Sequence, residues 1–64
     1  MRIFINSEKL VLDVNQLSTE EVLQCAGYEV SNKYSVLDEI TNQVYYIGDI
    51  ISLRNNTSLM IKIN

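Results

Sequence analysis

The sequence predicts an α+β fold in which one helix packs on one face of a mixed sheet of four to five strands. Three observations predict it: an alternating segment at the N-terminus, one capped amphipathic segment, and a strictly alternating segment at the C-terminus. The chain has 64 residues, 47% of them hydrophobic, which is enough for one core and one domain, residues 1–64. Two layers are needed at this size to bury the apolar faces of both a helix and a sheet.

The N-terminal third predicts a hairpin. Apolar residues such as Ile3 and Ile5 alternate with their neighbours, and strands are expected at about 2–6 and 9–14. The segment between them, 6–9, is polar and typical of a turn, and Asn6 tolerates a left-handed backbone.

A short helix is predicted over residues 18–26. Ser18 and Glu21 have the spacing of a capping box, in which each side chain bonds to the other residue's amide. Gly27 follows where a C′ glycine ends a helix. The helical period places four residues on the face that packs against the sheet: Thr19, Val22, Leu23 and Ala26.

The second half of the chain predicts further strands, at 34–37, 44–47 and 59–63. Residues 50–53 are apolar and fit either a short strand or a turn packed under the sheet. A crossover through the helix brings the last strand beside the first and parallel to it, which predicts a β-grasp sheet. The last strand is expected to point three side chains inward: Leu59, Ile61 and Ile63.

Composition narrows the classes of function. The five basic residues are scattered and the net charge is −3, which disfavours nucleic acid as a partner. There is no histidine, and the single cysteine, Cys25, has no activating base, so we expect a packing or flank residue and neither a metal site nor a cofactor. A core of this size leaves no room for a substrate pocket, so an enzyme is not expected. No signal peptide or membrane span is evident, and we expect a cytoplasmic protein.

The chain resembles ubiquitin-like domains, in particular the bacterial multiubiquitin type. The resemblance is carried by segments 2–6, 17–27, 34–37, 47–53 and 59–63. It implies a protein modifier whose C-terminal carboxylate is adenylated by an ATP-dependent activating enzyme and passed to a conjugating enzyme. It implies those two enzymes, and a deconjugating peptidase, as partners, and no catalytic group in the modifier itself.

The sequence departs from ubiquitin at the reactive end. Ubiquitin and its sulfur-carrier relatives end in a flexible Gly-Gly tail that can enter a narrow channel, whereas this chain ends Ile63-Asn64. The expected attachment point is therefore the carboxylate of Asn64, released by fraying of the last strand. The alternative is a non-covalent β-grasp adaptor that binds a partner through its outer sheet face.

The outer face of the predicted sheet is the expected partner-binding surface. If the inward set is correct, Phe4, Leu37 and Met60 point away from the helix and form one apolar patch, flanked by Arg2 and Lys62. Ubiquitin-like proteins use this region for recognition, and the resemblance implies the same here. The neighbouring tyrosines 45 and 46 alternate across a strand, so one caps the core edge and the other extends the partner face. Tyr45 is the one assigned to the partner face.

Overall fold

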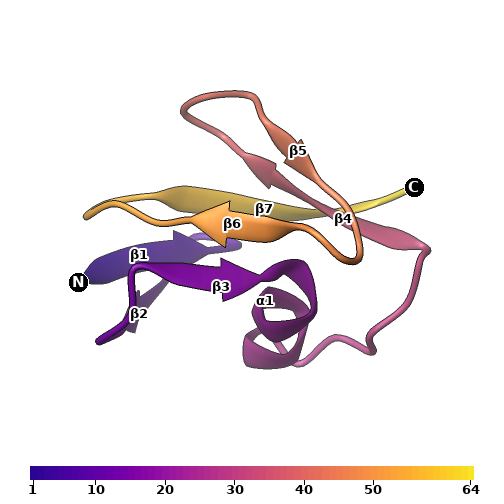
Figure 1. The fold of residues 1–64 in the computed structure, drawn as a ribbon, viewed down its shortest axis with the longest axis horizontal. Helices are drawn as coiled ribbons and strands as arrows, with labels where there is room; N and C mark the ends of the chain where they lie inside the picture. Colours follow the sequence, from indigo (N-terminus) through magenta and orange to yellow (C-terminus); the bar gives the residue numbers. More distant parts are fainter.

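A mixed five-stranded sheet carries a single helix on one face (Figure 1). The computed structural model describes all residues, 1–64. The strand order across the sheet is β2-β1-β7-β4-β5. In that order the strands are Glu8–Val11, Arg2–Ile5, Ser58–Ile63, Tyr34–Asp38 and Val44–Tyr45. The remaining elements are α1 (Thr19–Cys25) and a separate two-stranded sheet of β3 (Gln16–Ser18) and β6 (Ile50–Ser52).

The N-terminal hairpin and the parallel pairing of the first and last strands are as predicted from the order of elements. β1 and β7 are parallel, while β2, β4 and β5 each run antiparallel to their neighbours. Placing the first and last strands side by side at the centre requires a crossover between them, and α1 lies on that crossover. One helix and a mixed five-stranded sheet are confirmed, and the arrangement is consistent with a β-grasp-like class.

The β1–β2 hairpin turns more tightly than predicted. Asn6 and Ser7 have φ of 50° and 70°, the positive pair that a two-residue type I′ turn requires. β2 therefore starts at Glu8, inside the predicted turn, and ends at Val11, short of the predicted end at residue 14. Asn6 takes the left-handed conformation that its side chain tolerates, as predicted.

Both ends of α1 are capped as the sequence indicates. The Glu21 amide donates to Ser18 Oγ at 3.1 Å and the Ser18 amide donates to Glu21 Oε1 at 2.9 Å, so the capping box is complete. At the other end Gly27 has φ of 81°, its amide donates to the Gln24 carbonyl, and the Tyr28 amide donates to the Leu23 carbonyl. That pair of bonds is a Schellman motif, which satisfies carbonyls that the helix leaves free.

Two predictions in the second half need correction, for residues 44–47 and for Ile63, and the alternatives for residues 50–53 resolve to a strand. β5 covers two residues and not 44–47, because the chain leaves the sheet to form the turn in which the Asp49 amide donates to the Tyr46 carbonyl. Residues 50–53 resolve into a short strand, β6, and its partner β3 was not predicted at all. Ile63 does not point into the core: it is 81% exposed, because β7 runs past the packed part of the sheet.

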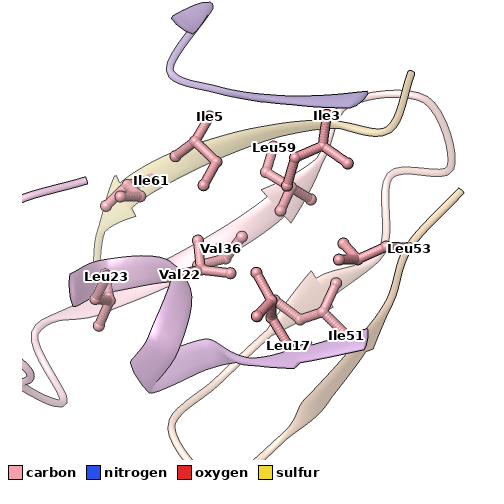
Figure 2. Packing of buried hydrophobic residues seen from close by; sticks show 10 residues of the cluster. All are labelled: Ile3, Ile5, Leu17, Val22, Leu23, Val36, Ile51, Leu53, Leu59 and Ile61. Carbon is pink, nitrogen blue, oxygen red and sulfur yellow. The ribbon is translucent and has the colours of Figure 1, made fainter. Parts of the chain in front are cut away.

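The core is one cluster that joins the large sheet, the helix and the small sheet (Figure 2). The large sheet contributes Ile3, Ile5, Val36, Leu59 and Ile61. The helix contributes Val22 and Leu23, and residues in and beside the small sheet contribute Leu17, Ile51 and Leu53. Thr19 is also fully buried and Ala26 is half-buried, so the predicted helix face is confirmed. The small sheet thus closes the side of the core that one helix leaves open.

The single helix has seven residues, and no helix in the chain is long and apolar enough to cross a membrane.

Candidate functional site

The side of the large sheet that faces away from α1 carries a continuous apolar band. Leu37 lies directly opposite Met60 on β7 and Val44 on β5. Phe4 pairs with the residue two positions before Met60, so the two are diagonal neighbours, and Val11 is diagonal to Phe4 across the hairpin. We call these five residues the outer apolar band: Val11, Phe4, Met60, Leu37 and Val44.

The three predicted members of the band lie together as expected. Phe4, Leu37 and Met60 are each half-buried by their neighbours on the same face. Val11 and Val44 at its two ends are 69% and 37% exposed. An apolar strip that crosses all five strands without a covering element differs from isolated exposed apolar side chains, which carry no meaning alone.

Three of the five basic residues share this face. Lys9 lies opposite Phe4, Arg2 lies opposite Val11, and Lys62 alternates with the buried residues of β7. The carboxylate of Glu39, at the end of β4, accepts a hydrogen bond from Ser58 Oγ at 2.8 Å. In a chain of net charge −3, the outer face is therefore locally basic. The basic residues are scattered in the sequence, and strand pairing places Arg2 and Lys9 toward one end of this face and Lys62 toward the other.

Sequence reasoning missed two members, Val11 and Val44, and a signal existed for Val11 alone. A two-residue turn at Asn6 places Lys9 opposite Phe4 and Val11 opposite Arg2 by counting alone. The turn was predicted to span residues 6–9. Because of that longer turn, the pairing of Lys9 with Phe4 and of Val11 with Arg2 was not predicted. Val44 required the β4–β5 register, which no local pattern specifies.

Tyr45 does not belong to the outer face, and its assignment there is wrong. Its register partner is Val36, a fully buried residue on the helix side, and its ring is half-buried against the core. Tyr46 lies beyond β5 and is 55% exposed. The pair therefore does divide between core edge and surface, but Val44 supplies the outward side chain of β5.

Asn64 follows the last residue of β7 and is held at the start of the neighbouring strand. Its amide donates to the Lys33 carbonyl at 2.7 Å, and its side-chain Nδ2 donates to the Asn32 carbonyl at 2.7 Å. Figure 1 shows this terminus beyond the sheet, away from the β2 edge. Lys62, two residues before Asn64 on β7, lies on the outer face, so the terminus is next to that face.

Two acidic side chains outside this face, Asp38 and Glu20, have structural roles. Asp38 is 1% exposed and faces inward, and its Oδ1 accepts hydrogen bonds from the amides of Ile40 at 2.9 Å and Thr41 at 3.2 Å. Glu20 Oε1 accepts a hydrogen bond from the Gly48 amide at 3.1 Å, which ties the helix to the turn before β6. Cys25 is exposed, and no group of three histidine, cysteine or acidic side chains is placed to hold a metal ion.

No protein-family model, curated protein or solved structure matches this chain. The outer apolar band, its basic neighbours and the position of Asn64 are therefore the features from which a function is inferred.

Proposed function

We propose that this chain is a ubiquitin-like protein modifier of a bacterial ubiquitination-like pathway. In this role the outer apolar band and its basic neighbours are recognised by an activating enzyme and a conjugating enzyme. The observation that carries the proposal is the combination of a β-grasp-like sheet, covered on one face by a helix, with an uncovered apolar band on the other. A sheet with one face buried in its own core has only the second face free for a partner.

The recognition surface favours a partner of definite chemistry. An apolar strip flanked by Arg2, Lys9 and Lys62 suits a partner that has an apolar centre and an acidic rim. The apolar contacts supply affinity and the charges supply orientation and association rate. This charge balance is opposite to that of the chain as a whole.

The reactive group in this proposal is the carboxylate of Asn64. The carboxylate attacks the α-phosphate of ATP and releases pyrophosphate, and an enzyme thiolate then displaces AMP to form a thioester. The hydrogen bonds from Asn64 to Asn32 and Lys33 must open before the terminus enters an active site. Terminal segments open at low free-energy cost, so two exposed hydrogen bonds are a modest barrier.

Those same two bonds favour a second candidate, a non-covalent adaptor that docks through the outer face. An end that is tied to the neighbouring strand is less suited to threading into a channel than a free tail. The adaptor uses the same surface and forms no covalent adduct.

One experiment separates the two. The protein is incubated with the products of its neighbouring genes, with and without ATP, and adducts are sought by intact mass. The modifier predicts an ATP-dependent adduct whose mass is the sum of the two proteins less one water, lost when Asn64 is deleted. Binding to the same proteins without any adduct supports the adaptor and contradicts the modifier. Absence of both adduct and binding contradicts both.

A further inference from the structure

We draw no further inference here: the strongest candidate, the unpaired edge of β6 in the small sheet with the exposed side chain of Ile50, carries none because nothing in the structure shows what covers that edge.

Discussion

At the residue scale, Asn6 makes contacts with distant parts of the chain that no local sequence pattern predicts. Its backbone occupies the left-handed region at the hairpin turn, and its amide donates to the Leu59 carbonyl at 2.9 Å. Its side-chain Oδ1 accepts from the Ile61 amide at 2.9 Å, and its Nδ2 reaches Tyr28. One residue thus connects the turn, the central parallel pair of strands and the segment after the helix.

Substitution of Asn6 separates its backbone role from its side-chain role. Asn6→Gly keeps the positive φ but leaves the part-buried Ile61 amide without its acceptor, which should cost about 1–3 kcal/mol. Asn6→Ala adds the strain of a positive φ and should be less stable than Asn6→Gly by about 1 kcal/mol. Urea unfolding followed by circular dichroism measures both. Equal stability of the two variants would show that the backbone conformation contributes nothing.

Asp38 is a second residue whose role depends on its position in space. Its carboxylate organises the turn after β4 by accepting two amides from within the core side of the sheet. Asp38→Ala should lower the free energy of unfolding by about 1–3 kcal/mol, because it leaves those two amides unpaired. The matched change at the neighbouring exposed Glu39, Glu39→Ala, should stay within about 0.5 kcal/mol. Thermal unfolding of the two variants under the same conditions makes the comparison.

At the element scale, α1 is short and depends on its caps. A helix of seven residues is too short to be stable alone in water, so its ends and its buried face determine its stability. The capping box stabilises the N-terminal end of the helix and the Schellman motif the C-terminal end. The hydrogen bonds from Thr19 to the Asp49 carbonyl attach the first turn of the helix to the turn before β6.

The capping box should behave as a coupled pair. Ser18→Ala should cost about 1 kcal/mol, within the usual range for loss of an N-cap. Glu21→Ala should cost less, because the Ser18 amide that it leaves is exposed to water. In a double-mutant cycle measured by urea unfolding, the combined loss should differ from the sum of the single losses. Strict additivity would contradict the reciprocal bonding.

At the scale of the whole molecule, the two faces of the sheet differ in what they contact: one packs against the core and the other is uncovered. The helix side holds the core, whose ten residues come from the large sheet, the helix and the small sheet (Figure 2). The other side holds the outer apolar band and three basic residues, while the helix carries acidic residues in its first turn. A small domain has only a few kcal/mol of net stability, and in the proposed function a partner covers the apolar strip across the sheet.

Disruption of the outer face should abolish partner binding without unfolding the chain. Met60→Asp places a charge at the centre of the band, next to Leu37, and should weaken binding to the conjugating-enzyme-like protein at least tenfold in calorimetry. Ile50→Asp, at an exposed position on β6, is the matched control and should bind like the natural chain. Unchanged binding of a folded Met60→Asp variant would remove the outer face from the proposed function.

Local chemistry accounts for what could be predicted from the sequence. The capping box, the C′ glycine, the left-handed Asn6 and the inward alternation of Leu59 and Ile61 all depend on neighbours within a few residues, and all are confirmed. The β3–β6 pairing was missed because three-residue strands have no pattern of their own, and their partners lie more than thirty residues apart.

The residues of the candidate site also fall into two groups: those that the sequence predicts and those that only the structure reveals. Phe4, Leu37 and Met60 follow from period-two alternation, which the sequence determines by itself along with the helix, its caps and the order of the elements. Tertiary structure alone decided that Val44 completes the band, that Tyr45 turns to the core, and that Ile63 lies in solvent. The physical reason is that alternation specifies which side of a strand a residue occupies. The pairing register and the extent of the covering layers then specify its neighbours and its exposure.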